Sequence, residues 1–181
     1  MRFSTPLPRR VALAATLALA ACASVPPLSA PPGGFELQGR VAVRYGSDGA
    51  SGRISWRHSR ESDELLLASS MGQGVARLRR EGGEIELLAQ GKQYRAADAE
   101  SLTERVLGWR LPLGGLTEWV QGRPSPDAPA QVERDADNRI AVLVQDDWKI
   151  EYQEYDGARP SKLRLARPGL EIRMIVDQWA Q

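Results

Sequence analysis

The side chains that most often do chemistry in proteins are scarce in this sequence. Of its 181 residues, one is a cysteine, Cys22, and one is a histidine, His58. A lone cysteine can form neither an intramolecular disulfide nor a cysteine-based metal site, and a lone histidine cannot belong to a histidine metal cluster. No G-x-S-x-G nucleophile motif accompanies His58, so we expect a surface histidine at a strand end. These residues favour a protein that is not an enzyme and holds neither a metal nor a cofactor.

Two other short motifs have ordinary structural explanations. Asp146 and Asp147 stand directly before Trp148, where two adjacent acids are typical of a hairpin turn. The segment Gly72-Gln73-Gly74-Val75 is followed by neither a third glycine nor a helical pattern, which excludes a dinucleotide-binding loop.

Cys22 stands at the end of what reads as an export signal. Arg9 and Arg10 precede an apolar run over residues 11–20, which is too short to span a bilayer because a spanning helix needs roughly 20 apolar residues. The run ends in Leu19-Ala20-Ala21-Cys22, which resembles a bacterial lipobox, where the cysteine becomes the acylated first residue of the mature protein. The alternative is cleavage at an ordinary Ala-x-Ala site beside an incidental Cys22. We expect residues 1–21 to be a lipoprotein signal peptide.

Residues 22–34 are rich in proline after the cysteine and predict a flexible tether that carries the lipid. Residues 35–181 suit one domain with a single core. In Gram-negative bacteria an aspartate directly after the lipidated cysteine usually retains a lipoprotein in the inner membrane. Ala23 stands there instead, which implies by that rule an outer-membrane lipoprotein facing the periplasm. Without its signal peptide the chain is close to neutral, which argues against nucleic-acid binding.

The elements that position these residues are mainly strands. Short segments with period-two alternation and glycine-rich turns between them, including a turn over residues 46–52, predict antiparallel hairpins. They cover residues 35–45, 53–58, 63–70, 75–80 and 84–89, then 130–135, 139–145, 148–155, 161–166 and 170–179.

Between the two groups of strands the pattern becomes helical. Residues 98–109 carry an apolar stripe of Leu102, Val106 and Trp109 with Leu107 beside it. Either Asp98 or Ser101 caps this helix, and Ser101 begins a capping-box pattern that ends at Glu104. We expect a second short helix over residues 114–122 and a loop over residues 123–130.

About eleven strands with two inserted helices predict a mainly β fold, an incomplete (half-open) antiparallel β-barrel. The helices would form a lid over its concave face. Periodicity alone does not separate an apolar cavity beneath such a lid from a filled core.

The order of short motifs resembles the LolB family of outer-membrane lipoprotein receptors. After the lipobox come FELQGRVAV, SWRH, LLLASSMGQG, YRAADAESL, LGWRLPLGGLTEWVQGRPSP and QDDWKIEYQEY, then a final strand ending near Trp179. The resemblance implies a monomer without enzymatic activity whose apolar interior accepts the acyl chains of lipoproteins from the periplasmic carrier LolA. The receptor then passes this cargo into the inner leaflet of the outer membrane.

The resemblance also implies two sets of functional residues. A protruding loop with an exposed apolar residue places cargo in the membrane, and its counterpart here holds Ser70, Met71 and Gly72. Met71 stands where the family usually has leucine, and Ser70 replaces the common proline. The alternative is that Met71 folds back onto the sheet and packs in the core. For the acyl-chain cavity we expect Val41, Val43, Ile54, Trp56, Leu65, Leu67, Leu102, Val106, Trp119, Val144, Trp148 and Ile150.

Two other functions share the signal peptide, the tether and the β-rich body. A scaffold lipoprotein would bind another envelope protein and carry no lipid, and a lipid-binding lipoprotein would carry free lipid instead of acylated protein. A receptor would contain bound lipid, whereas a scaffold lipoprotein would not. A receptor would also take an acylated protein from the carrier, whereas a carrier of free lipid would not.

Overall fold

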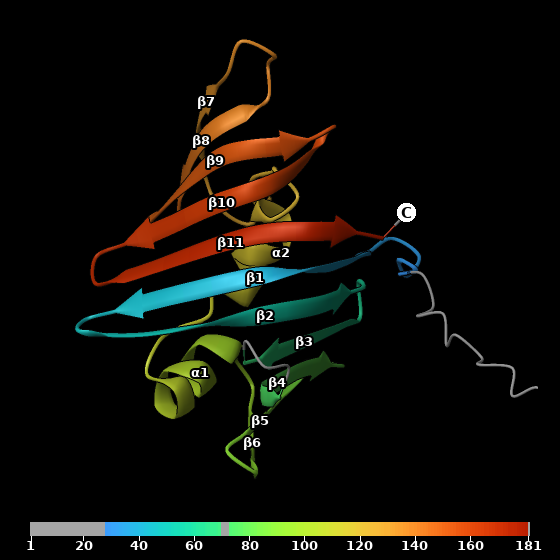
Figure 1. Ribbon diagram of the computed structural model, residues 1–181, viewed down its shortest axis with the longest axis vertical. Coiled ribbons are helices and arrows are strands. Elements are labelled where there is room, and N and C mark those ends of the chain that lie inside the picture. The colour runs from blue at the N-terminus through green and yellow to red at the C-terminus, as the bar shows by residue number, and fades with distance from the viewer. Residues whose placement is uncertain (1–27, 70–72, 181) are drawn as a thin grey trace, which may run out of the picture.

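The computed structural model describes residues 28–69 and 73–180. In this part of the chain, six strands precede two short helices and five strands follow them (Figure 1). The first six strands are β1 (Phe35–Tyr45), β2 (Asp48–His58), β3 (Ser62–Ala68), β4 (Gly74–Glu81), β5 (Glu84–Ala89) and β6 (Lys92–Ala96). The helices are α1 (Ala99–Leu107) and α2 (Leu113–Trp119). The last five strands are β7 (Gln131–Arg134), β8 (Ile140–Gln145), β9 (Trp148–Asp156), β10 (Arg159–Arg167) and β11 (Leu170–Trp179).

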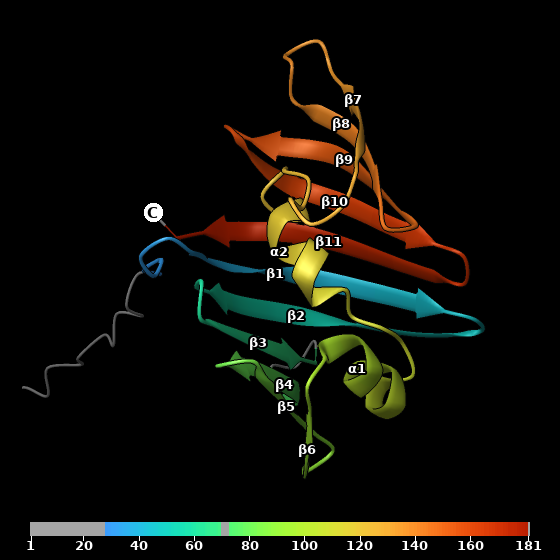
Figure 2. The same ribbon diagram turned by 180° about the vertical axis from the view of Figure 1, so that it is seen from behind.

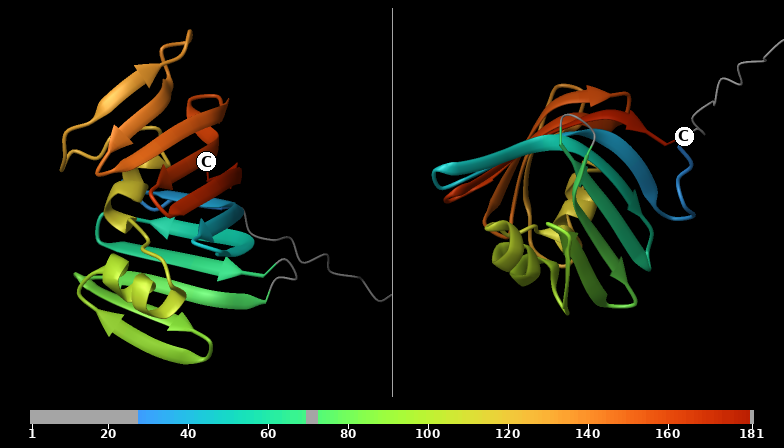
Figure 3. Two further views of the ribbon diagram at one scale, coloured as in Figure 1. Left: turned by 90° about the vertical axis from the view of Figure 1, so that its left-hand side faces the viewer. Right: turned by 60° about the horizontal axis from the view of Figure 1, so that its bottom comes forward.

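All eleven strands form one antiparallel sheet in the order β6-β5-β4-β3-β2-β1-β11-β10-β9-β8-β7. Pairing of β1 with β11 joins the two groups of hairpins. The sheet curls, with β6 and β7 at its two free edges and both helices on its concave side (Figures 2 and 3). The predicted incomplete barrel with inserted helices is confirmed. No helix among the described residues is long and apolar enough to cross a bilayer.

Tight turns connect the hairpins. Asp146 and Asp147 both have positive φ, 50° and 62°, as the two-residue turn between β8 and β9 requires. This confirms the turn interpretation of the two acids. The turn predicted over residues 46–52 is shorter than expected, because Asp48 to Gly52 already pair with β1 and belong to β2.

Helix α1 begins at a single capping residue. The Asp98 carboxylate accepts a hydrogen bond of 2.9 Å from the backbone N–H of Ser101, which satisfies one of the free donors of the first turn. Of the two predicted caps the structure therefore selects Asp98, and Ser101 lies inside the helix. The helix ends at Gly108, whose φ of 84° is left-handed.

The two faces of the sheet differ in chemistry. Buried side chains of the strands pack on the concave side with the helices. On the convex side, one cross-strand row from β2 to β6 alternates in charge, because each member lies opposite an oppositely charged neighbour. The row consists of Arg57, Glu64, Arg79, Glu86 and Arg95. We call it the charge ladder.

Candidate functional site

An apolar cavity lies between the concave face of the sheet and the two helices. Its volume is about 40 Å³, and its wall is apolar except for Thr103. The wall draws on β1 to β5, β11, both helices and the segment between them. It consists of Val41, Val43, Ile54, Leu65, Leu67, Ala76, Leu78, Leu87, Thr103, Leu107, Trp109, Leu111, Leu116, Ile172 and Met174.

Thr103 offers no free polar group to this cavity. Its hydroxyl donates to the carbonyl oxygen of Ala99 at 2.8 Å and accepts from the backbone N–H of Leu111 at 2.9 Å. The second bond fixes the chain that leaves α1 against the helix. Because the wall presents carbon and this satisfied hydroxyl, the site suits an apolar guest and disfavours a charged one.

Five of the twelve residues predicted for the cavity line it: Val41, Val43, Ile54, Leu65 and Leu67. Six others belong to the packed interior outside its wall. Trp56, Leu102, Trp119, Trp148 and Ile150 are almost wholly buried, and Val106 packs against them partly buried.

Val144 is the twelfth, and its predicted place in the cavity is wrong. Its side chain is 40 % exposed, whereas its neighbours Leu143 and Gln145 are buried. Residues 140–144 are apolar at every position, so alternation could not show which face of β8 turns inward. The structure buries the polar Gln145 in place of its neighbour Val144.

The sequence did not mark several wall residues as cavity residues, including Ile172, Met174, Leu111 and Leu116. The alternation along β11 could have predicted Ile172 and Met174, because every second residue of this strand faces inward and the residues between them are exposed or half-exposed. No comparable signal exists for Leu111, which lies between the helices.

Helix α2 is fixed to the second half of the sheet by buried hydrogen bonds. The indole N–H of Trp119 donates to the side-chain oxygen of Gln145 at 2.8 Å, and the same oxygen accepts from the backbone N–H of Ser125. The Gln145 amide group donates to the carbonyl of Ser125 at 2.8 Å. The hydroxyl of Tyr152 donates to the Trp119 carbonyl at 2.8 Å, and burial raises the pKa of Tyr152. The C-terminal end of α2 is therefore held by directed bonds.

Helix α1 is held differently. Its side-chain hydrogen bonds and ion pairs, as far as the described residues show, stay within residues 98–111; examples are Thr103 to Ala99 and Arg110 to Glu104. Its other contacts are apolar, because Ala99 and Leu102 belong to the buried core and Val106 and Leu107 pack against it. Apolar packing is not directional, so α1 can leave the sheet without breaking a directed bond.

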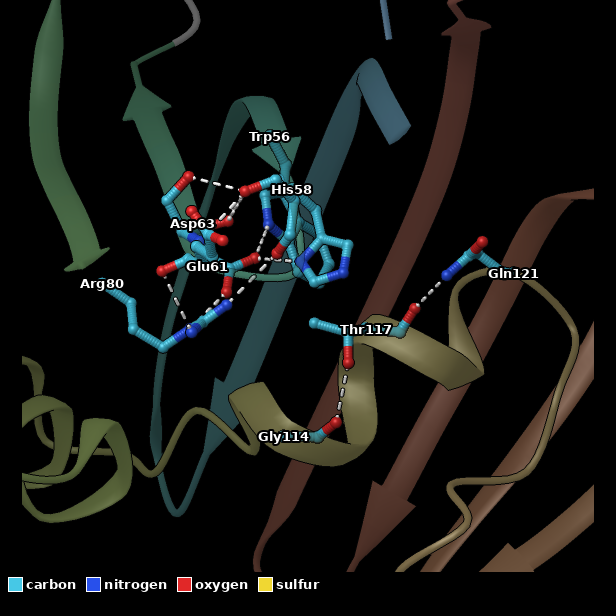
Figure 4. A network of polar contacts seen from close by, with 10 residues as sticks. Trp56, His58, Glu61, Asp63, Arg80, Gly114, Thr117 and Gln121 are labelled. Carbon is cyan, nitrogen blue, oxygen red and sulfur yellow. Dashed lines mark hydrogen bonds and ion pairs between the residues drawn. The ribbon is translucent and has the colours of Figure 1, made fainter. Parts of the chain in front are cut away.

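A second polar network crosses β2, β3 and β4 around Asp63 (Figure 4). The Asp63 carboxylate is 1 % exposed. It accepts hydrogen bonds from the Trp56 indole at 2.9 Å and from Arg80 at 2.6 Å, and it lies 2.7 Å from Nδ1 of His58. Burial is the largest influence on this carboxyl and opposes its charge, but the hydrogen bonds from His58, Trp56 and Arg80 outweigh it. The pKa of Asp63 therefore lies below its ordinary value.

The prediction of a surface histidine at His58 is correct in its place at the end of β2 and wrong in its exposure. Its side chain is 14 % exposed, and its ring lies 5.0 Å from that of Phe35. The sequence missed the reason, which is that the buried acid Asp63, the second residue of β3, pairs with His58 of β2. The network joins β2, β3 and β4 through hydrogen bonds, so we interpret it as stabilising the fold.

Cys22, Ser70, Met71 and Gly72 lie outside the described residues. The structure does show the two residues that flank the predicted membrane loop. The backbone N–H of Ser69 donates to the carbonyl of Gln73 at 2.8 Å, so these two residues lie side by side between the end of β3 and the start of β4.

Comparison with known proteins gives one consistent family. Residues 33–179 match the family described as "Outer membrane lipoprotein LolB". A protein of Thiobacillus denitrificans named "Outer-membrane lipoprotein LolB" is 44 % identical, covering 94 % of this chain and 97 % of its own. One of the same name from Nitrosomonas europaea is 40 % identical, covering 80 % of this chain and 72 % of its own. Among solved structures, a LolA superfamily protein from Nitrosomonas europaea superposes with a TM-score of 0.47 at 12 % identity, covering 83 % and 87 % of the two chains.

Proposed function

Because the chain belongs to the LolB family of outer-membrane lipoproteins, we propose that it receives acylated lipoproteins from the periplasmic carrier LolA. It then passes them into the inner leaflet of the outer membrane. One observation carries this proposal, the apolar cavity between the curved sheet and the two helices. A wall of carbon with one satisfied hydroxyl suits acyl chains and offers nothing to a polar substrate.

The cargo makes such shelter necessary. Three acyl chains with about 15 methylenes each, at roughly 0.8 kcal/mol per methylene, would cost on the order of 35 kcal/mol if they crossed water uncovered. A chain of carriers, each of which binds the lipid somewhat better than the one before, removes this barrier without ATP.

The cavity volume of about 40 Å³ has room for a few water-sized groups. An acyl chain does not fit that volume, so cargo enters only when the helices move away from the sheet. The bonding pattern favours α1 as the part that moves, because α1 rests on apolar contacts while Trp119, at the end of α2, bonds to Gln145.

Two further residues and one segment complete the proposal. Acylation of Cys22 anchors the protein, residues 22–34 form the tether, and Met71 enters the membrane when cargo is released. A flexible, apolar methionine suits such a probe.

Cargo transfer tests the proposal directly. A LolA–lipoprotein complex is mixed with the acylated protein in vesicles, and the cargo bound to each partner is measured by pull-down. We expect the cargo to pass to the protein. Leu67→Gln, which places an amide in the cavity wall, should weaken retention of the cargo about tenfold.

Val144→Gln is the matched control, because Val144 lies outside the cavity wall and is 40 % exposed. It should leave transfer unchanged. Equal transfer by both variants would remove the cavity from the mechanism, and binding of free lipid without transfer of acylated protein would favour a lipid carrier.

A further inference from the structure

The convex face of the sheet changes character next to the charge ladder. The next outward row, toward the β3–β4 connection, places Ser55, Leu66, Arg77 and Leu88 opposite one another. Beyond it stands Val75. Leu88 is 43 % exposed and Val75 54 %, and the large exposed apolar side chains of the described residues are these two with Val132 and Val144. Two of the four thus share one face of β4 and β5, where they line a shallow hollow with Leu66 and Arg77.

Arg53 lies on β2 near this hollow, and the structure gives it no acidic partner among the described residues. Arg53 lies directly opposite Arg40 on β1, and like charges in that position repel. Arg40 is compensated by Asp177 at 2.7 Å, whereas no acid of the described residues lies within ion-pair distance of Arg53. Arg53 lines a second hollow together with Ala68 and Leu66, and Leu66 also lines the first.

We propose that this surface, made of Leu66, Val75 and Leu88 with Arg53 and Arg77, contacts the anionic phospholipid headgroups of the leaflet that holds the protein. We call it the outer patch. This inference rests on the proposed function, which places the protein at that leaflet and gives it cargo to release there. Guanidinium groups bind phosphate in bidentate geometry, and the aliphatic side chains between them suit the boundary between headgroups and acyl chains.

The composition of the outer patch favours lipid over a protein partner. Protein interfaces are rich in aromatic residues, methionine and arginine at their centres, and of these the outer patch has only the arginines, beside leucine and valine. An attached bilayer is moreover always close at hand, so weak contacts suffice.

The tether is long enough for this contact. The thirteen residues 22–34 span at most about 45 Å when extended. Arg53 pairs with Arg40, which lies five residues after the start of β1 at Phe35, or about 17 Å along the strand. An anchor at Cys22 therefore leaves slack for the outer patch to reach the bilayer.

A dye at position 88 tests the inference in the full acylated protein. Acylation occupies the thiol of Cys22, so Leu88→Cys accepts an environment-sensitive fluorophore at one site, and Val144→Cys is the matched control on another part of the sheet. Both are reconstituted in phosphatidylethanolamine vesicles with and without phosphatidylglycerol, some carrying a headgroup nitroxide quencher. We expect quenching and a blue shift at position 88 with phosphatidylglycerol, and neither at position 144. Arg53→Gln and Arg77→Gln should each lower the docked population about fivefold.

Equal signals at the two positions would overturn the inference. So would a signal at position 88 that appears only when LolA is added, because the outer patch would then bind a protein. Cargo transfer is measured on the same samples to keep the two hypotheses apart. Transfer without lipid contact at position 88 would refute the outer patch and leave the receptor function standing, and lipid contact without transfer would do the reverse.

Discussion

At the scale of single residues, Asp63 is a buried side chain that joins three strands through hydrogen bonds near the cavity. Among the described residues it is the one acid that is buried, and its partners come from β2 and β4 on either side of its own strand. A buried charge is tolerated only when hydrogen bonds replace the water that it has lost. Asp63 has those bonds, and it can therefore align three strand ends beside the cavity wall.

Replacing Asp63 by asparagine should destabilise the protein by about 2–3 kcal/mol at neutral pH, because Arg80 and His58 lose a charged acceptor. Since the pKa of the folded carboxyl lies below its ordinary value of 3.8, its stabilisation is complete above that pH and is lost as the pH falls through the folded pKa. Urea unfolding of both proteins over a pH series measures this. The exposed Asp48→Asn is the matched control, and a variant as stable as the parent would refute the structural role.

Met71 is a second single residue whose side chain can be tested by substitution. We expect Met71→Glu to take cargo from LolA normally and to fail in releasing it into vesicles, because a charged tip opposes entry into the membrane. Met71→Leu, which restores the residue common in the family, should release cargo at the parent rate. Cargo in the protein and in the bilayer can be separated by flotation. Unchanged delivery by the glutamate variant would exclude Met71 from the mechanism.

At the scale of elements, the two helices are attached to the sheet by different forces. The end of α2 is bonded to β8 and β9 through Trp119, Gln145 and Tyr152, while α1 lies on the core through apolar contacts. Motion of a packed helix costs buried area, and motion of a bonded helix also leaves buried polar groups without partners. The opening of the cavity should therefore begin at α1.

Hydrogen exchange tests this order of opening. Amides of Leu102 to Leu107 should exchange faster than those of Trp119 and Val120 in the empty protein, because local opening exposes the first set. Gln145→Leu leaves the Trp119 indole and the Ser125 backbone N–H without an acceptor, and it should cost about 2–3 kcal/mol and bring the two rates together. Slower exchange in α1 than in α2 would contradict the proposed opening.

The elements also show what the sequence could predict. Ten strand segments and both helices followed from alternation and helical period, and capping chemistry narrowed the start of α1 to Asp98 or Ser101, of which the structure has Asp98. The sequence could not predict which face of β8 turns inward, because residues 140–144 are apolar on both faces and the buried residue at the end of the strand is the polar Gln145. Gln145 is buried because Trp119 and Ser125 supply its partners from far along the chain. Asp63 is the same case, since its three partners become neighbours only when the hairpins pair.

At the scale of the whole molecule, the sheet remains open between β6 and β7. Unpaired edges invite association with other strands unless polar side chains protect them. Lys92, Gln93 and Arg95 are exposed on β6, and all four residues of β7 are exposed. This protection agrees with the expected monomer, in which the curved sheet keeps its concave face available for a guest.

We expect the proposed lipid anchor at Cys22 to decide where that open molecule works. A Cys22→Ala protein, exported on a signal peptide that is cleaved without acylation, should appear in the soluble periplasmic fraction, since stable attachment takes more than one weak contact. It should still take cargo from LolA, because the cavity wall lies wholly within residues 41–174. Delivery into vesicles should fall, because a freely diffusing protein loses the high local concentration of bilayer that the tether provides. Fractionation and the transfer assay measure the two effects separately. Residual membrane attachment of the variant would show that something other than Cys22 anchors the protein.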